Sequence, residues 1–150
     1  MRALVRRVSF AEVKVASSPV GSIGSGLLVY LGIHHKDETS DLDWIIKKVL
    51  GLRVFEDEGS KMNLKIGANH GILLVSQFTL LGNLKKGYRP SFNRAADPRT
   101  GAYFYDLALE KLKKNFTGVV ESGIFGADMQ IHAVDEGPVT IWIDSQNRDY

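Results

Sequence analysis

Apolar and polar residues along this chain are distributed in a pattern that predicts more strands than helices. Near the amino end, apolar residues alternate with polar ones, which is typical of half-buried strands. Segment 26–33 is continuously apolar, as in a strand buried on both faces, and segment 71–80, which ends in a polar cluster, is the strongest strand candidate. The expected strands cover residues 3–8, 11–15, 26–33, 52–55, 71–80, 129–134 and 139–143.

Two segments have helical spacing instead. The first begins at Ser40, where Asp43 forms an acidic variant of the capping box, and ends near Gly51. Its apolar positions are Leu42, Ile45, Ile46 and Val49. The second contains Tyr103, Leu107, Leu109 and Leu112, with lysines in its last turn. Two helices are too few for a doubly wound sheet, so the pattern favours a β-rich fold, a largely antiparallel sheet or barrel with two packed helices.

Composition excludes several kinds of chemistry. The 150 residues are 44% apolar and 24% charged and contain no cysteine, which predicts one domain over 1–150 without disulfides, iron–sulfur clusters or thiol catalysis. No apolar run approaches a membrane span, and the amino end lacks the apolar segment of a secretory signal. We therefore expect a cytoplasmic protein without membrane contact.

Metal and nucleotide motifs are not found in the sequence. The four histidines lack metal-ligand spacing, and no glycine-rich phosphate or dinucleotide motif is present. We expect no metal and no cofactor. A net charge of +2 is too small to indicate nucleic-acid binding by itself.

A polar cluster, Ser76-Gln77-Phe78-Thr79, ends the most apolar predicted strand. In a plain strand, Ser76 and Phe78 would face one side and Gln77 and Thr79 the other. These hydroxyl and amide groups could line a cleft, or they could satisfy nearby backbone groups. Thr79 as a nucleophile would need an adjacent base, which the sequence does not identify.

Two further segments have a functional and a plain interpretation. Gly137-Pro138 could be a turn between two strands, and the dipeptide alone does not predict a cis bond. Basic residues and aromatics alternate over 85–99, which fits either a phosphate-binding loop or a solvated one. The residues concerned are Lys85, Lys86, Tyr88, Arg89, Phe92, Arg94 and Arg99.

Taken together, these segments resemble the D-aminoacyl-tRNA deacylase family. The family's SQFTL strand matches 76–80, and its GPVT turn matches 137–140. Segments 1–8, 86–92 and 123–129 also have the family's character, so the likeness extends from residue 1 to about 145. The two signatures in this order and spacing are highly specific.

The resemblance implies a fold, a partner and an activity. The family has a barrel-like α/β domain that works as a symmetric homodimer. It hydrolyses the ester between a D-amino acid and the 3′-terminal ribose of tRNA, a chiral proofreading activity that recycles mischarged tRNA. The implied partners are D-aminoacyl-tRNA and glycyl-tRNA. No cofactor and no side-chain nucleophile are implied, since backbone groups position the ester and the ribose 2′-hydroxyl assists the attack of water.

Site residues follow by position from the same resemblance. Ser76, Gln77, Phe78 and Thr79 would form the floor of the pocket for the aminoacyl adenosine. Gly137 and Pro138 would reach into the partner subunit's pocket through a cis peptide bond. Phe125 and Met129 match pocket-side positions, and Arg7 would brace the Gly-Pro segment.

The chain departs from the family pattern at Asp135-Glu136, Leu81 and Tyr88, where Asn-Asp, Tyr and Asn are usual. The signatures themselves are intact, which favours the D-specific branch over a related branch that removes L-alanine. Two alternatives stay open. The chain could be a non-catalytic nucleic-acid-binding module that uses 85–99, or a hydrolase with Thr79 as its nucleophile.

Overall fold

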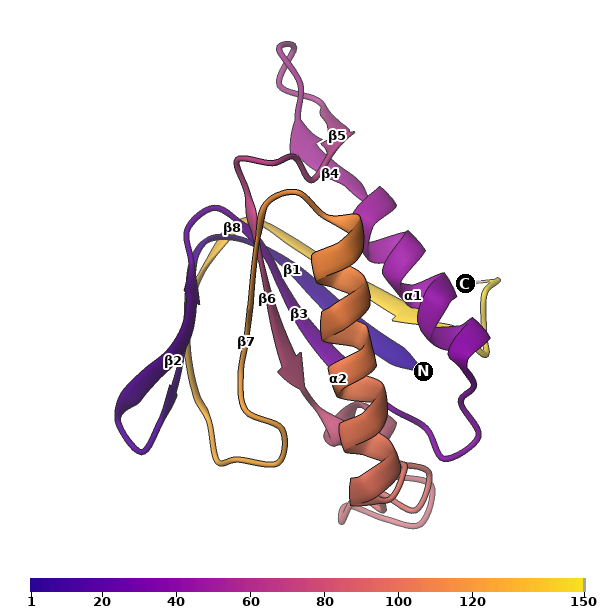
Figure 1. Ribbon diagram of the computed structural model, residues 1–150. Helices are drawn as coiled ribbons and strands as arrows, with labels where there is room; N and C mark the ends of the chain where they lie inside the picture. The colour runs from indigo at the N-terminus through magenta and orange to yellow at the C-terminus, as the bar shows by residue number, and fades with distance from the viewer. Residues whose placement is uncertain (150) are drawn as a thin grey trace.

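The structure, a computed structural model, describes residues 1–149 and consists of a strongly curved sheet with two helices packed on one face (Figure 1). The sheet order is β2-β1-β3-β6-β7, and β8 pairs with the other edge of β1. Its strands are β1 (Arg2–Val15), β2 (Ser18–Ile23), β3 (Gly26–Gly32), β6 (Gly71–Ser76), β7 (Val119–Ser122) and β8 (Gln130–Asp144). A small hairpin of β4 (Arg53–Glu56) and β5 (Met62–Lys65) projects from one end.

The predicted barrel-like α/β architecture with two helices is confirmed, with a more mixed sheet than expected. β1 runs antiparallel to β2, β3 and β8, whereas β3, β6 and β7 are parallel to one another. Helices α1 (Thr39–Gly51) and α2 (Pro98–Asn115) provide the crossovers that parallel strands require. The curvature brings β2 against β7, so that a Cβ placed on Gly21 would lie 2.6 Å from the carbonyl oxygen of Ser122.

Strands β1 and β8 are each continuous, although the sequence predicted each of them as two strands separated by a break. β1 passes through residues 9 and 10 because register shifts relative to β8, between Arg6 and Phe10, absorb the irregularity. β8 continues through 135–138, which the sequence predicted as a separating turn. Conversely, β6 ends at Ser76 rather than at 80, and a 3₁₀ turn, η1 (Phe78–Leu81), follows it. Strands β2, β5 and β7 were not predicted, because they are short and weakly apolar.

Both helices occur where the spacing predicted them, with corrections to their ends and faces. The capping residue of α1 is Glu38 rather than Ser40, and the Glu38 backbone N–H donates to Asp41 at 3.0 Å. On α2 the sequence predicted Tyr103 on the apolar face, but its side chain is 60% exposed. The buried face instead consists of Gly101, Phe104, Tyr105, Ala108 and Leu112, which recur at three- and four-residue intervals.

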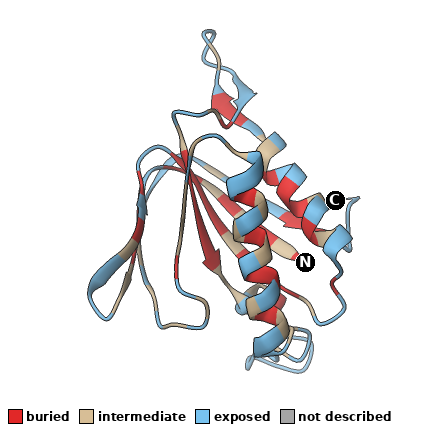
Figure 2. Ribbon diagram, viewed as in Figure 1, coloured by how far each residue is buried: buried red, intermediate tan, exposed pale blue. Residues whose placement is uncertain are grey.

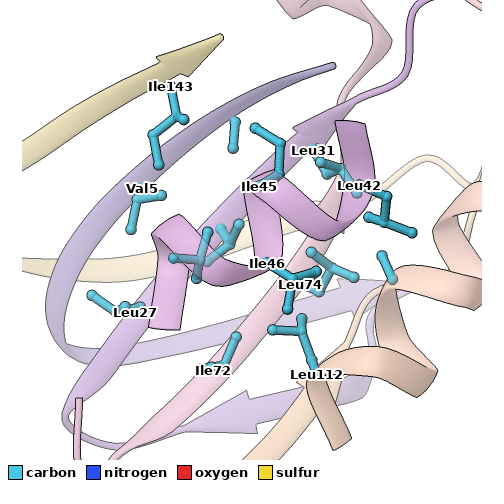
Figure 3. Packing of buried hydrophobic residues seen from close by; sticks show 14 of the residues in the cluster. Val5, Leu27, Leu31, Leu42, Ile45, Ile46, Ile72, Leu74, Leu112 and Ile143 are labelled. Carbon is cyan, nitrogen blue, oxygen red and sulfur yellow. The ribbon is translucent and has the colours of Figure 1, made fainter. Parts of the chain in front are cut away.

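The core fills the space between the sheet and the helices (Figure 3). Side chains from β1, β3, β6 and β8 meet those of α1 and α2 there. Figure 3 labels Val5, Leu27, Leu31, Leu42, Ile45, Ile46, Ile72, Leu74, Leu112 and Ile143. A second cluster on the concave, barrel side of the sheet includes Val8, Val13, Leu28, Leu73 and Val75. Each face of the central strands is therefore buried, which accounts for their continuous apolar runs. Within 1–149, no helix combines the length and apolar character needed to cross a membrane.

Candidate active site

A cavity of about 730 Å³ opens on the side of the sheet away from the helices. Its walls come from β1, β3, β6, η1, β8 and the segment that precedes β8. The lining residues are Leu4, Arg6, Tyr30, Val75, Ser76, Gln77, Phe78, Thr79, Leu80, Gly126, Ala127, Met129, Ile131, Asp135 and Thr140. This volume is in the range of pockets that hold small-molecule groups.

All four residues of the polar cluster 76–79 line this one cavity. The expected alternation of Ser76 and Phe78 against Gln77 and Thr79 is wrong, because the strand ends at Ser76 and the chain turns into η1. The backbone N–H of Gln77 donates to the carbonyl oxygen of Leu31 at 2.8 Å and fixes the start of this turn. The turn, which the sequence pattern did not indicate, therefore gathers the cluster on one wall.

The polar groups of this wall can position a ligand but are not arranged to activate a nucleophile. Gln77 Nε2 donates to Thr79 Oγ1 at 2.5 Å. An amide cannot accept a proton from a hydroxyl group at neutral pH. Within residues 1–149, no hydrogen bond joins the Thr79 hydroxyl to a carboxylate or an imidazole. The geometry therefore does not favour Thr79 as the nucleophile of a side-chain-driven hydrolase.

The lining of the cavity also contains an ion pair that the sequence analysis did not predict. Arg6 Nε and Nη2 donate to the two oxygens of Asp135 at 2.8 and 2.6 Å. The hydrogen bond with Asp135 raises the pKa of Arg6, and burial opposes this effect. The negative charge of Asp135, one of the departures from the family pattern, is thus paired inside the chain. The alternation of Leu4 and Arg6 on β1 was a signal that could have placed Arg6 on this face.

Met129 and Phe125, both predicted on the pocket side, have different surroundings. Met129 lines the main cavity. Phe125 lines a separate cavity of about 70 Å³, which shares Gln77 and Phe78 with the main one. The Phe125 ring packs against α2, where a Cβ on Gly101 would lie 2.9 Å from its Cζ. Phe125 therefore packs between α2 and the residues Gln77 and Phe78 of the main cavity.

Tyr105 on α2 stabilises this region from the core. Its hydroxyl donates to the carbonyl oxygen of Leu74 at 2.8 Å, with the carbonyl oxygen of Gly123 at 3.2 Å. Burial raises the pKa of Tyr105 to about 12, so the phenol stays protonated at neutral pH. The segment before β8 is thereby held to β6.

Gly137 and Pro138 are not among the residues that line the 76–79 cavity of the same chain. The peptide bond between them is cis, as the resemblance implied, and Gly137 has a φ of +121°. Both residues are exposed. Gly137 borders a different hollow, of about 570 Å³, between β8 and the β4–β5 hairpin.

Arg7, which the resemblance assigns to the support of the Gly-Pro segment, contacts the residue that precedes that segment. The Arg7 side chain is buried and bridges two strands. Its Nε donates to the carbonyl oxygen of Glu136 at 3.2 Å, and its Nη1 donates to that of Val54 at 2.5 Å. Arg7 thus ties the residue that precedes Gly137 to β4.

Metal-binding side chains do not gather in the part of the chain that the structure describes. Among residues 1–149, no group of three or more His, Asp or Glu side chains is placed to hold a metal ion. The groups that the cavity offers are therefore hydroxyls, one amide, the Arg6–Asp135 pair and backbone atoms.

Comparisons with known proteins agree with one another over nearly the whole chain. The family model described as D-Tyr-tRNA(Tyr) deacylase matches residues 4–144. A D-aminoacyl-tRNA deacylase of Geobacter sulfurreducens is 47% identical over 150 residues, covering 99% of this chain and 97% of the relative. One of Kosmotoga olearia is 48% identical over 149 residues, covering 99% of both chains.

Solved structures share the fold. The c-Myc DNA Unwinding Element Binding Protein aligns with a TM-score of 0.89 at 40% identity, over 96% of this chain and 98% of its own. A probable eukaryotic D-amino acid tRNA deacylase aligns with a TM-score of 0.80 at 18% identity, over 95% and 97%. Because the model match spans both signatures and relatives of nearly half identity align from end to end, the chain belongs to the D-Tyr-tRNA(Tyr) deacylase family.

Proposed function

We propose that this protein hydrolyses the ester that joins a D-amino acid to the 3′-terminal ribose of tRNA. The observation that carries the proposal is the convergence of Ser76, Gln77, Phe78 and Thr79 on one cavity, in a chain whose relatives are named for this reaction. The cavity offers apolar surface for the adenine and amino-acid groups and polar groups for the ribose.

The reaction proceeds by attack of water on the ester carbonyl carbon. The bond to the 3′-oxygen breaks, the amino acid leaves with a new carboxyl oxygen from water, and the ribose oxygen takes up a proton. The neighbouring 2′-hydroxyl assists this proton transfer, and Gln77 and Thr79 hold the ribose and ester in place. This division of roles is consistent with the lack of a base on Thr79 within residues 1–149.

The proposal includes a homodimer in which each Gly137-Pro138 segment enters the partner subunit's cavity. Two features support it. The segment is exposed, and it borders a hollow that the 76–79 cluster does not share. A two-fold interface is self-complementary, so both sites would form together.

Subunit mixing tests the dimer directly. A Gly137→Ala subunit keeps its cavity, and a Gln77→Ala subunit keeps its Gly-Pro segment. If the segments cross, co-expressed mixed dimers regain one complete site, while each variant alone is impaired. A fully active monomer on a sizing column at working concentration would refute the arrangement.

Selectivity follows from rejection at the α-carbon. Rigid backbone beside the α-carbon excludes an L side chain by steric clash, and it cannot exclude glycine, which has no side chain. We therefore infer that D-tyrosyl-tRNA and glycyl-tRNA are cleaved and that L-tyrosyl-tRNA is spared, as chiral proofreading requires. Parallel deacylation of the three substrates at one enzyme concentration measures this. Equal cleavage of the D and L forms would contradict it.

A second candidate is a non-catalytic nucleic-acid-binding module. The basic segment 85–99 favours it, and so does the name of one structural neighbour, the c-Myc DNA Unwinding Element Binding Protein. Incubation with D-tyrosyl-tRNA separates the two functions. Loss of the ester with turnover supports the hydrolase, whereas retention of intact D-tyrosyl-tRNA supports the binding module.

A further inference from the structure

The segment that follows η1 has an unbalanced positive charge. No Asp or Glu occurs between Lys61 and Ala96. Within this stretch, residues 83–91 form a projection that we call the basic loop. It presents Lys85, Lys86, Tyr88 and Arg89, all exposed, and Tyr88 is 103% exposed.

Within residues 1–149, the cations of the basic loop form no ion pair with a carboxylate. Among residues 1–149, the ion pairs of lysine and arginine side chains are those of Arg2, Arg6, Lys14 and Lys111. The basic loop therefore offers three cations that no acidic side chain in the described part of the chain neutralises. An exposed aromatic ring among such cations is the combination with which proteins bind single-stranded nucleic acid.

Backbone hydrogen bonds hold the basic loop in shape. Asn83 and Ser91 exchange two of them, at 2.9 and 3.0 Å. Inside the loop, the Asn83 side chain accepts from the backbone N–H of Lys85 at 2.9 Å, and Gly87 turns the chain with a φ of +120°. The cations and Tyr88 are thus presented on a closed projection whose shape limits the cost of ordering it on binding.

The basic loop also adjoins the cavity. It begins two residues after η1, which forms one wall. Just beyond the loop, the Phe92 ring packs edge-on against Phe78 of that wall, with centroids 5.0 Å apart. In Figure 1 this segment lies below the start of α2, and Figure 2 colours it as exposed.

We propose that the basic loop binds the single-stranded nucleotides that precede the terminal adenosine of tRNA. Tyr88 stacks on one of their bases, while Lys85, Lys86 and Arg89 neutralise the phosphates. This inference deepens the proposed function and rests on it, because it takes the terminal adenosine to occupy the adjoining cavity. Stacking tolerates any base, so the basic loop reads the presence of a free 3′ end rather than its sequence.

Other exposed lysines provide a matched comparison. Lys113 and Lys114 are exposed at the far end of α2, whose 18 residues span about 27 Å. The aromatic residue nearest to them in the sequence, Phe116, is partly buried and packs against the core, whereas Tyr88 in the basic loop is fully exposed.

The experiment measures binding of an uncharged RNA minihelix with a single-stranded ACCA 3′ end, by fluorescence anisotropy over a range of salt concentrations. For Lys85→Ala/Lys86→Ala, we expect weaker binding and a slope of log Kd against log salt that is lower by roughly 1.4, or 0.7 for each lost contact to a single strand. The pair Lys113→Ala/Lys114→Ala makes the same charge change and should leave slope and affinity near those of the wild type.

Tyr88 is tested in parallel. Tyr88→Ala should weaken binding by roughly 5- to 150-fold, and Tyr88→Phe should retain it, because the ring and not the hydroxyl stacks. The loss should disappear on a blunt minihelix that lacks the four 3′ nucleotides. Equal losses from the two lysine pairs, or wild-type affinity of Tyr88→Ala, would overturn the inference.

Deacylation of D-tyrosyl-tRNA separates this inference from the proposed function. If the wild type turns over the substrate but the basic-loop variants bind RNA like the wild type, only the basic-loop inference fails. If the wild type gives no turnover, the proposed function fails. The inference then fails with it, because it requires the terminal adenosine to bind in the cavity.

Discussion

Gly137 occupies a backbone conformation that side chains of L-residues rarely adopt. Its φ is +121°, and an added Cβ would lie 2.9 Å from Val139 Cγ2 and 3.0 Å from Arg7 Nη2. In the sequence, only the match of Gly137-Pro138 to the family's GPVT signature indicated that backbone groups act at this position. The structure adds a local reason why the position requires glycine.

Gly137→Ala should therefore lower kcat/KM for D-tyrosyl-tRNA by about 10- to 100-fold, since small displacements near a reacting centre have effects of this size. Gly24→Ala is the control, because a Cβ there meets nothing within 4 Å and the φ of Gly24 is ordinary. Far-ultraviolet circular dichroism checks the fold. Wild-type turnover of a folded Gly137→Ala protein would show that the Gly137-Pro138 segment has no role in the reaction.

The loss of kcat caused by Thr79→Ala distinguishes two mechanisms. If Thr79 only helps to position the ester, Thr79→Ala should cost about 10- to 100-fold in kcat. Removal of a covalent nucleophile costs on the order of 10⁶. Single-turnover kinetics measures the loss, and mass spectrometry after rapid quenching searches for an acyl-enzyme. An acylated Thr79 would contradict the positioning role.

At the scale of elements, two contacts can be tested, the cap at the start of α2 and the bridge made by Arg7. Arg7 connects β1 to β4 and β8 through two backbone carbonyls. Asp97 caps α2 by accepting from the backbone N–H groups of Arg99 and Thr100 at 3.0 and 3.1 Å. The contacts of Arg7 and of Asp97 can each be removed by a single substitution.

Arg7→Met should remove the donor from the carbonyl oxygen of Val54, which is buried, and from that of Glu136, which is partly buried. We expect the free energy of unfolding to fall by about 1–3 kcal/mol, measured by urea denaturation. Deacylation should fall as well, because the segment before Gly137 loses its brace. Arg53→Met, at an exposed position of β4, should change stability by no more than about 0.5 kcal/mol. Unchanged stability of Arg7→Met would contradict the bridging role.

Asp97→Ala should lower the thermal midpoint by about 2–4 °C through loss of the helix cap, while Asp97→Asn should keep most of it. Hydrogen bonds from Thr100 lower the pKa of Asp97. The folded pKa is thus below the unfolded value of about 3.9, so the ionised cap stabilises above that pH. This contribution is lost as the pH falls through the folded pKa. In thermal melts, the difference between wild type and Asp97→Asn should shrink as the pH is lowered stepwise from 7 into the acid range.

At the scale of the whole molecule, the two faces of the curved sheet carry different structures. The helices cover one face and complete the main core, while the other face carries a second apolar cluster and the cavity. Because the proposed hydrolysis uses hydroxyl, amide and backbone groups, we expect chelators to leave turnover unchanged. Deacylation of D-tyrosyl-tRNA after dialysis against EDTA measures this. Loss of activity that added zinc restores would show that a metal takes part.

The sequence by itself determined the parts of this protein that depend on local periodicity and on short signatures. The apolar spacing placed both helices and the central strands, because burial on one or both faces imposes a period that short windows reveal. The SQFTL and GPVT segments indicated the family, and the family match over residues 4–144 confirms it.

Only the tertiary structure decided how these parts meet. The 3₁₀ turn after Ser76 depends on a hydrogen bond from Gln77 to Leu31, a partner 46 positions away in the chain. The pairing of Arg6 with Asp135 requires β1 and β8 to lie side by side and crosses the register shift between Arg6 and Val8. The parallel pairing of β3, β6 and β7 depends on helices that cross over the sheet. Such contacts join residues far apart in sequence, and local propensity carries no information about them, so the cavity follows from packing and register.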